Sequence, residues 1–327
     1  MRNLGKLAVL GITALGLALA GPQDNSLVIG ASQEPRVLAG DFLSVISNQA
    51  IKSEIEQYLF APFIGFNADS QNFPVLATEV PTLENGRLRV TDIGGGKKRL
   101  EMDITIRPDA KWSDGRPITT EDVAFYFEVG KAKGMPVLNP DFWERVNVRI
   151  KDARNFTLIF EPAYYYDTYG PINTYAPKHI MGPEWERVKA AARGLDPQKD
   201  AEKLNELYRN FFIKFSTPQA LNRGAMVYSG PFMLRRWVPG NSIEMVRNPN
   251  FPIKPEGGES KYVQKVVYRF IQNTNSLLVA VIGGSIDATS SVSLTFDQGR
   301  SPQLVRRAPG RFDIWFVPGA IWEHIDI

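Results

Sequence analysis

Residues 106–123, which read IRPDAKWSDGRPITTEDV, constrain the fold of this chain more than any other stretch. The Asp114-Gly115 step is a turn signal, and a helix is expected to start shortly after it. Thr119 and Asp122 have the spacing of a capping box, in which each side chain accepts a hydrogen bond from the other residue's backbone N–H. The stretch therefore predicts a turn and a helix start, and it assigns the Glu121-Asp122 pair to capping and not to catalysis.

The first twenty residues have the layout of a secretory signal peptide. Arg2 and Lys6 precede an uncharged apolar run that ends in Ala18-Leu19-Ala20, where we expect cleavage. Uncharged residues continue only to Gln23, which falls short of the ~20 apolar residues that a bilayer span needs. The sequence therefore predicts a periplasmic or other extracytoplasmic location, with an uncleaved N-terminal anchor as the alternative.

The chain contains no cysteine, which excludes both disulfides and a lipid anchor on an N-terminal cysteine. An exported chain of this kind must take its stability from a hydrophobic core. Removing Arg2 and Lys6 from the 38 basic residues leaves 36 against 35 acidic ones, so the net charge is only +1. This near-neutral charge gives no indication of nucleic-acid binding. After cleavage about 307 residues remain, enough for two domains or one large one.

Alternating apolar residues predict three antiparallel hairpins, with arms at residues 87–91 and 99–107, 146–150 and 156–160, and 233–238 and 243–247. Residues 27–30 predict a first strand, and apolar spacing over 48–60 predicts a helix. Near the end, 265–271 predicts a strand, Asn275 is expected to cap a helix through Ile282, and Gly283-Gly284 is expected to end it. This change to a βα pattern predicts a second domain that begins near Tyr262.

The 106–123 stretch closely resembles the signature of the peptide/nickel class of solute-binding proteins of ABC importers. Further matches occur in family order from about Leu27 to the last residue. They are Ala176-Pro177-Lys178-His179-Ile180, Ser229-Gly230-Pro231-Phe232 with the following Trp237, Arg247-Asn248-Pro249, and Val266 to Phe270 followed by Gly284-Ser285-Ile286-Asp287.

The resemblance implies a mixed α/β (α+β) chain with a bilobed, periplasmic-binding-protein type II-like fold. On this template residues 1–20 are the signal peptide, 21–50 and 167–260 form lobe one, 51–166 form an extra subdomain, and 261–327 begin lobe two. Family members run further, so we expect an incomplete second lobe, from truncation, a split gene or a fragment, with a minimal natural variant as the alternative. The expected partners are a small solute and the membrane permease, and the chain is expected to be a monomer.

Family members that bind peptides hold the ligand main chain like an added strand. The resemblance places the ligand-binding residues at Asn48, Gln49, Ala50, Phe142, Trp143, Ala288, Thr289, Ser290, Ser291 and Trp322. Each has a plainer reading: Asn48 as a helix cap, Trp143 as a core residue, or Ser290 as a turn residue. The acid that binds a peptide's amino group in the family lies beyond Ile327, so it has no counterpart in this sequence. Trp112 and Asp114 are expected to pack the subdomain and not to contact ligand.

Three functions are weighed against one another. A di- or oligopeptide receptor is favoured, with sugars and metal complexes as other cargo. A truncated remnant, or a partial receptor that has no binding activity alone, is the second interpretation. A secreted hydrolase is the third, but the sequence has no G-x-S-x-G or H-E-x-x-H motif, no cysteine, and only the histidines His179 and His324. No enzyme activity, cofactor or metal is therefore expected.

Overall fold

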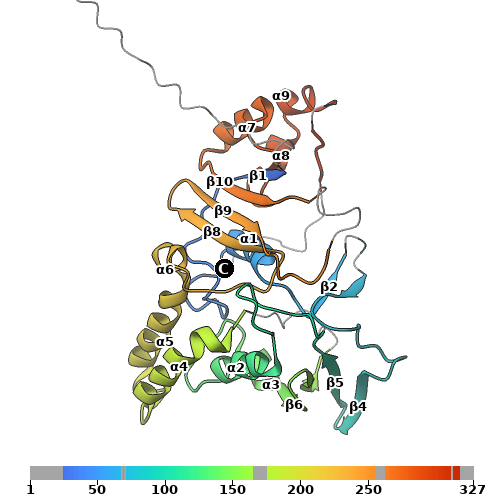
Figure 1. The fold of residues 1–327 in the computed structure, drawn as a ribbon, viewed down its shortest axis with the longest axis vertical. Coiled ribbons are helices and arrows are strands. Elements are labelled where there is room, and N and C mark those ends of the chain that lie inside the picture. The colour runs from blue at the N-terminus through green and yellow to red at the C-terminus, as the bar shows by residue number, and fades with distance from the viewer. Residues whose placement is uncertain are drawn as a thin grey trace, which may run out of the picture.

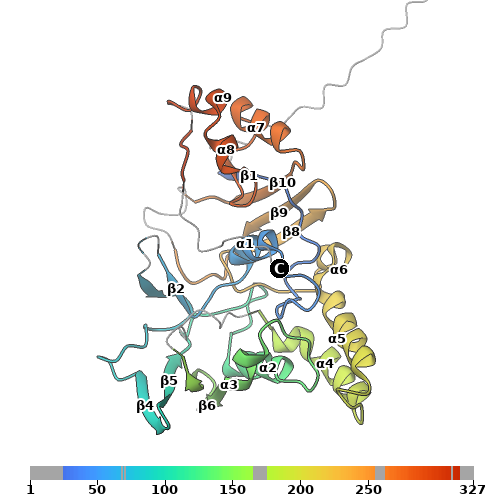
Figure 2. The same ribbon diagram turned by 180° about the vertical axis from the view of Figure 1, so that it is seen from behind.

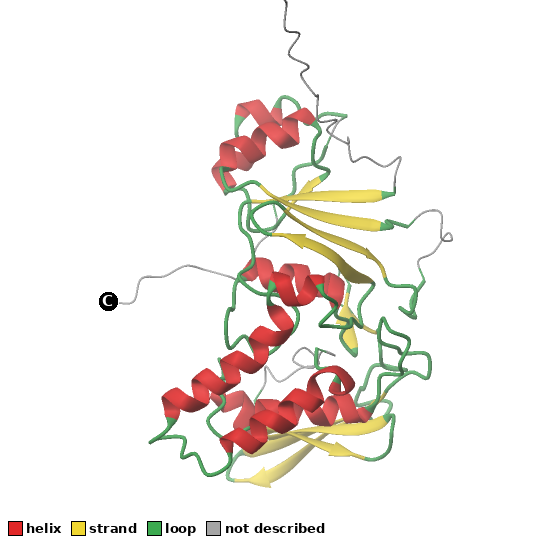
Figure 3. Ribbon diagram, turned by 60° about the vertical axis from the view of Figure 1, so that its left-hand side comes forward, coloured by secondary structure: helices red, strands yellow, loops and turns green. Residues whose placement is uncertain are grey.

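The computed structural model describes residues 25–67, 69, 71–164, 175–254, 262–310 and 312–316, which contain two main β-sheets (Figure 1). The sheets lie toward opposite ends of the molecule with helices between them, and a further helical group covers the upper sheet (Figure 3). The expected signal peptide lies outside the described residues. Within the part described, no helix is both long and apolar enough to cross a membrane.

The upper sheet has the strand order β11-β1-β10-β9-β8, and Figure 2 shows it from behind. Its strands are β1 (Ser26–Ala31), β8 (Phe232–Val238), β9 (Ser242–Arg247), β10 (Lys265–Phe270) and β11 (Ala288–Thr289). Strand β1 is parallel to both β10 and β11, whereas β9 is antiparallel to β8 and β10. The predicted β8–β9 hairpin and the unit formed by β10, α7 (Thr274–Gly283) and β11 are both confirmed.

The start of α7 differs from the expectation. Asn273, and not Asn275, is the N-cap, because its side chain accepts a hydrogen bond from the N–H of Ser276 at 3.0 Å. The helix ends as expected at the glycine pair, where Gly284 has a φ of 70° that favours glycine.

The strand order also bears on the expected domain limits, which stay predictions. β10 and β11 follow the boundary placed after residue 260, yet they share a sheet with β1 and β8. Similarly, α1 (Ala50–Leu59) crosses the boundary placed after residue 50 and packs against β8.

The lower sheet is antiparallel with the order β4-β5-β7-β6, and it confirms the other two predicted hairpins. Its strands are β4 (Leu88–Gly94), β5 (Lys97–Thr105), β6 (Val146–Ile150) and β7 (Asn155–Ala163). Gly94, Gly95 and Gly96 all have positive φ, so the glycine triplet serves the β4–β5 turn. The remaining elements are β2 (Ile64–Phe66), β3 (Asn72–Pro74), α2 (Thr120–Gly130), α3 (Pro140–Arg145), α4 (Lys178–Ala192), α5 (Ala201–Ser216), α6 (Pro218–Asn222), α8 (Phe296–Gly299) and α9 (Pro302–Val305).

The 106–123 stretch folds as predicted. Asp122 and Thr119 form the capping box at the start of α2. The Asp122 carboxylate also accepts hydrogen bonds from the Trp112 indole at 3.3 Å and from the backbone N–H of Lys178 at 2.9 Å. Trp112 is fully buried, so the signature stretch ties α2, α4 and the turn together and has a packing role.

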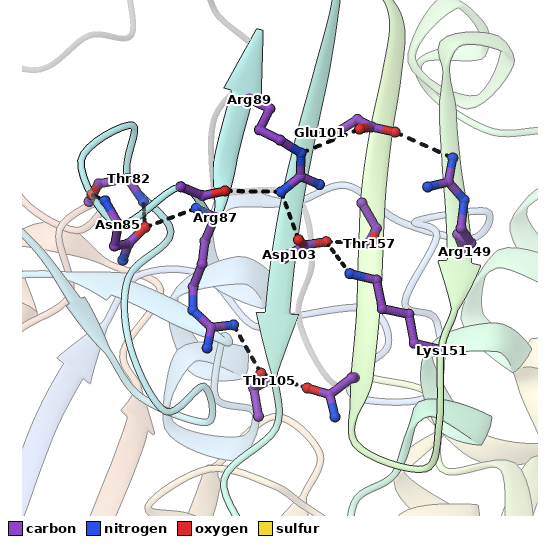
Figure 4. A network of polar contacts seen from close by, with 12 residues as sticks. Thr82, Asn85, Arg87, Arg89, Glu101, Asp103, Thr105, Arg149, Lys151 and Thr157 are labelled. Atoms are coloured by element: carbon purple, nitrogen blue, oxygen red, sulfur yellow. Dashed lines mark hydrogen bonds and ion pairs between the residues drawn. The ribbon is translucent and has the colours of Figure 1, made fainter.

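One face of the lower sheet carries a network of charged side chains (Figure 4). Asp103 on β5 lies at its centre and accepts hydrogen bonds from Arg89 at 2.7 Å, Lys151 at 2.7 Å and Thr157 at 2.6 Å. Glu101 bridges Arg89 and Arg149 in the same way. The network therefore links β4, β5, β7 and the end of β6 across the sheet.

We expect Asp103→Asn to lower the free energy of unfolding by about 2 kcal/mol, since hydrogen bonds to charged groups contribute more than neutral ones. Partial burial alone would raise the pKa of Asp103, but hydrogen bonds from Arg89, Lys151 and Thr157 outweigh it and hold the pKa well below its usual range. A depressed carboxyl pKa stabilises the fold above the unfolded-state pKa of about 4, and this stability is lost as the pH falls through the folded-state value. Urea unfolding at pH 7 and pH 3 measures both effects.

Asp92→Asn is the matched control for this prediction. Asp92 also bonds a lysine, Lys98, at 2.7 Å, but both side chains are more than half exposed. Exposed pairs contribute little, so this variant should unfold like the wild type. Equal losses in the two variants would contradict the central role of Asp103.

Candidate functional site

The carboxyl ends of three parallel strands lie at one edge of the upper sheet. Ala31 ends β1, Phe270 ends β10 and Thr289 ends β11, with β1 between the other two. From this edge β1 continues toward α1, whereas β11 continues toward α8. Open α/β sheets bind ligands where the chain leaves neighbouring parallel strands in different directions. We call the residues around these strand ends, 32–36, 48–50 and 290–293, the carboxyl edge.

Gln49 joins two of these segments. Its side-chain oxygen accepts hydrogen bonds from the N–H of Arg36 at 2.7 Å and from the Ser47 hydroxyl at 2.9 Å, and its amide nitrogen donates to the carbonyl of Glu34 at 3.4 Å. Asn48 and Ala50 on either side are exposed. Gln49 is therefore positioned to fix the loop after β1, while its two neighbours face solvent.

The segment after β11 is held against the end of β1. The N–H of Ser290 donates to the carbonyl of Gly30 at 2.9 Å, and the N–H of Ser32 donates to the Ser293 hydroxyl at 3.2 Å. Ser290 is buried, whereas Ala288 and Ser291 are exposed. The structure thus brings the predicted residues at 288–291 to the same edge as those at 48–50.

Glu54, which the sequence did not single out, connects these two groups. One carboxylate oxygen accepts from the Ser290 hydroxyl at 2.9 Å and from the N–H and hydroxyl of Ser291 at 3.1 and 2.6 Å. The other accepts from the Tyr268 hydroxyl at 2.8 Å. Burial raises the pKa of Tyr268, and the neighbouring Tyr58 and Glu54 raise it further, so the phenol stays protonated as a donor.

A buried ionic cluster underlies the loop that leads into α1. The Lys52 ammonium lies 3.3 Å from Glu56 and 4.0 Å from Asp41, and all three side chains are nearly inaccessible. Lys52 also donates to the carbonyl of Asp41 at 2.9 Å, and Glu56 accepts from the N–H of Ala39 at 2.9 Å. Burial raises the pKa of Asp41, and it raises that of Glu56 to about 7 despite the attraction of Lys52.

Sequence reasoning missed this cluster. Lys52 and Glu56 have the i, i+4 spacing of an ordinary exposed helix pair, and their third member, Asp41, comes from a loop. The available signal was the charge pair inside an otherwise apolar face that contains Ile51 and Ile55.

The aromatic pair on α3 does not join the carboxyl edge. Figure 1 places α3 beside α2 and the lower sheet, away from β1 and β10. Trp143 is only 9% exposed and packs against Tyr126 and Phe127, with ring centroids 5.4 and 5.9 Å away. Phe142 is half-buried against Trp143 and Phe160. This packing favours the core interpretation of Trp143, and the ligand-binding roles of Phe142 and Trp143 stay predictions. Trp322 lies outside the described residues.

Two surface hollows lie elsewhere. One of about 570 Å³ borders the β8–β9 hairpin and includes Arg235 and Glu244, and one of about 550 Å³ lies between α2 and α4 and includes Glu121 and Lys178. Neither contains a residue of the carboxyl edge. The candidate site therefore depends on strand geometry and hydrogen bonding.

The chemistry available to other kinds of site is limited among the described residues. His179 bonds Asp114 at 2.9 Å and its ring contacts that of Trp112, which gives it a structural role. No group of three or more histidine or carboxylate side chains in the described part could hold a metal ion. His324 lies outside the described residues.

Comparison with known proteins places this geometry in context. The profile of bacterial extracellular solute-binding proteins, family 5 Middle, matches residues 97–311. The crystal structure of an oligopeptide binding protein from Thermus thermophilus, complexed with pentapeptide, has 97% sequence identity and a TM-score of 0.91, covering 93% of this chain and 51% of that one.

Two curated relatives are more distant. Oligopeptide-binding protein AppA of Bacillus subtilis is 23% identical over 270 residues, which are 81% of this chain and 40% of AppA. Peptidoglycan-binding protein YepA of Agrobacterium fabrum is 29% identical over 199 residues, which are 58% of this chain and 26% of YepA. The chain thus spans about half the length of the Thermus thermophilus protein and less than half of these two relatives.

Proposed function

This chain belongs to the family 5 bacterial extracellular solute-binding proteins, and we propose that it forms part of a receptor that captures a short peptide outside the cytoplasm. The observation that carries the proposal is the 97% identity with an oligopeptide binding protein complexed with pentapeptide. The family is one of solute-binding proteins and not of enzymes. The signal-peptide pattern of the first twenty residues supports a periplasmic location, and delivery to an ABC permease follows from the importer class.

The carboxyl edge supports the same proposal. Residues 48, 50 and 291 are exposed, and hydrogen bonds of Gln49 and Glu54 fix the backbone beside them. A peptide main chain that binds like an added strand needs pre-positioned backbone groups, and it needs few specific side chains. The ligand-binding roles of Asn48, Gln49, Ala50 and residues 288–291 are accordingly part of this proposal.

Thermal unfolding with ligand tests the proposal. Tri- to pentapeptides at ~100-fold above their Kd should stabilise the chain by about 2.7 kcal/mol, because a ligand that binds only the folded state stabilises it by mass action. The melting temperature should then rise by several degrees, roughly 1–4 °C for each kcal/mol in a chain of this size. Oligosaccharides and nickel chelates at the same concentration should give no rise.

The Thermus thermophilus protein serves as the positive control in the same assay. A peptide-dependent shift in that protein without one in this chain would contradict the proposal and favour the reading as a partial receptor that does not bind alone. A shift with an oligosaccharide or nickel chelate, and none with peptides, would replace the ligand class.

A further inference from the structure

Four hydrogen bonds converge on the Glu54 carboxylate from two parts of the chain that are distant in sequence. The donors are the Tyr268 hydroxyl on β10, the Ser290 hydroxyl, and both the N–H and the hydroxyl of Ser291. A carboxylate has about four acceptor sites. Three of these donors reach one oxygen of Glu54 and the fourth reaches the other, so the carboxylate is engaged mainly by groups of this chain.

The segment 290–293 is consequently held from two sides. On one side Ser290 and Ser293 bond the carbonyl of Gly30, at 2.9 and 3.3 Å, at the end of β1. On the other side Glu54 holds Ser290 and Ser291 from the first half of α1. Glu54 stands one helical turn after Ala50, so the same helix presents the exposed residues of the 48–50 segment and the anchor for 290–291.

We propose that Glu54 is a positioning residue of the ligand site, which locks the 290–293 segment to α1 and thereby sets the spacing between the two halves of the carboxyl edge. The expected effect on peptide affinity rests on the proposed function. The lock itself is a set of contacts within this chain and does not depend on that function. Charged acceptors form the stronger class of protein hydrogen bond, and Glu54 receives one backbone and three hydroxyl donors.

Tyr268 keeps its contact with Tyr58 if Glu54 is removed, because the two ring centroids lie 6.0 Å apart. The inner end of the network therefore remains anchored in the sheet. The Ser291 side loses both of its bonds to the carboxylate. Loss of Glu54 should consequently loosen the exposed segment much more than it disturbs the core.

Hydrogen exchange of the wild type, Glu54→Ala, Glu54→Gln and Ser291→Ala tests the lock. Glu54→Ala should speed exchange of the Ser291 amide about tenfold or more, and amides in the central strand β10 should be unaffected. Gln57→Ala is the matched control, since Gln57 is an exposed side chain of similar length on the same helix. Ser291→Ala removes one of the donors to Glu54 from an exposed position. It replaces Glu54→Ala as the test of the lock if Glu54→Ala does not fold.

Peptide affinity of the same variants tests the consequence. Glu54→Ala should weaken binding about tenfold, or about 1.4 kcal/mol, with a smaller loss in Glu54→Gln, which keeps one acceptor oxygen, and none in Gln57→Ala. Unchanged exchange at Ser291 would overturn the lock, and faster exchange with unchanged affinity would overturn the positioning role. If the wild type binds no peptide, the proposed function fails, and the exchange data alone decide whether the lock exists.

Discussion

Replacing Lys52 with methionine is expected to lower the free energy of unfolding by about 3–5 kcal/mol, the usual cost of removing one partner from a buried ionic pair. The Lys52 side chain is 2% exposed, and it is the cation between Asp41 and Glu56, which are 0% and 6% exposed. Methionine fills a similar volume, so the loss comes from the charge and from the hydrogen bonds to Asp41 and Ser44. Two carboxylates would remain buried without a cation.

The pH dependence separates this effect from simple packing loss. Burial raises the pKa of Glu56 from 4.5 to about 7 in the folded chain. Between these two pH values the folded state therefore keeps a proton on Glu56 that the unfolded state releases. A raised carboxyl pKa contributes stability below the unfolded-state value, and that stability is lost as the pH rises through the folded-state value. Removing Lys52 raises the pKa further, so Lys52→Met should lose more stability at pH 8 than at pH 5.

Urea unfolding at these two pH values measures the prediction. Lys203→Met is the control, because Lys203 is 71% exposed and its ion pair with Asp200 lies on the surface. Glu56→Gln should also reduce the pH dependence of the wild type between pH 5 and 8. A Lys52→Met variant that is as stable as the control, or equally destabilised at both pH values, would contradict the charge-based account.

The sequence predicted best where local chemistry determines the backbone. The three hairpins, the capping box of Thr119 and Asp122, and the glycine-ended helix α7 all depend on residues within a few positions of one another. Trp112 was correctly assigned to packing because it lies inside a recognisable turn motif. In such segments the sequence pattern alone therefore predicts the secondary structure.

Contacts between distant segments could not be predicted in this way. The bonds between Glu54 and Ser291 join residues 237 positions apart, and Asp41 meets Lys52 only because the loop after β1 folds back over α1. The same holds for Trp143. Its ring contacts Tyr126 and Phe127 on another helix, so the sequence alone could not distinguish a core position from a rim position. The sequence named the segments 48–50 and 288–291, whose ligand-binding roles stay predictions, but it gave none of the hydrogen bonds that join them.

Gly230→Ala is expected to destabilise the chain by about 3 kcal/mol, the upper part of the range for overpacking a tight core. A Cβ at Gly230 would lie 2.6 Å from the carbonyl carbon of Leu59 and 2.7 Å from the N of Phe60. These are backbone atoms at the end of α1, so they cannot move aside as a flexible side chain could. The N–H of Gly230 also donates to the carbonyl of Leu59 at 2.8 Å, which holds the two segments together.

The control for this variant is Gly283→Ala at the end of α7, where the new Cβ would meet no atom within 4 Å. That substitution should be neutral or stabilising, since alanine favours helices over glycine by about 1 kcal/mol. Thermal unfolding compares the stability of the two variants. Equal stability would contradict the prediction, because it would show that α1 shifts away from the new Cβ at no cost in free energy. Because α1 also carries Glu54, a displaced helix in Gly230→Ala should speed exchange of the Ser291 amide, which couples this packing contact to the carboxyl edge.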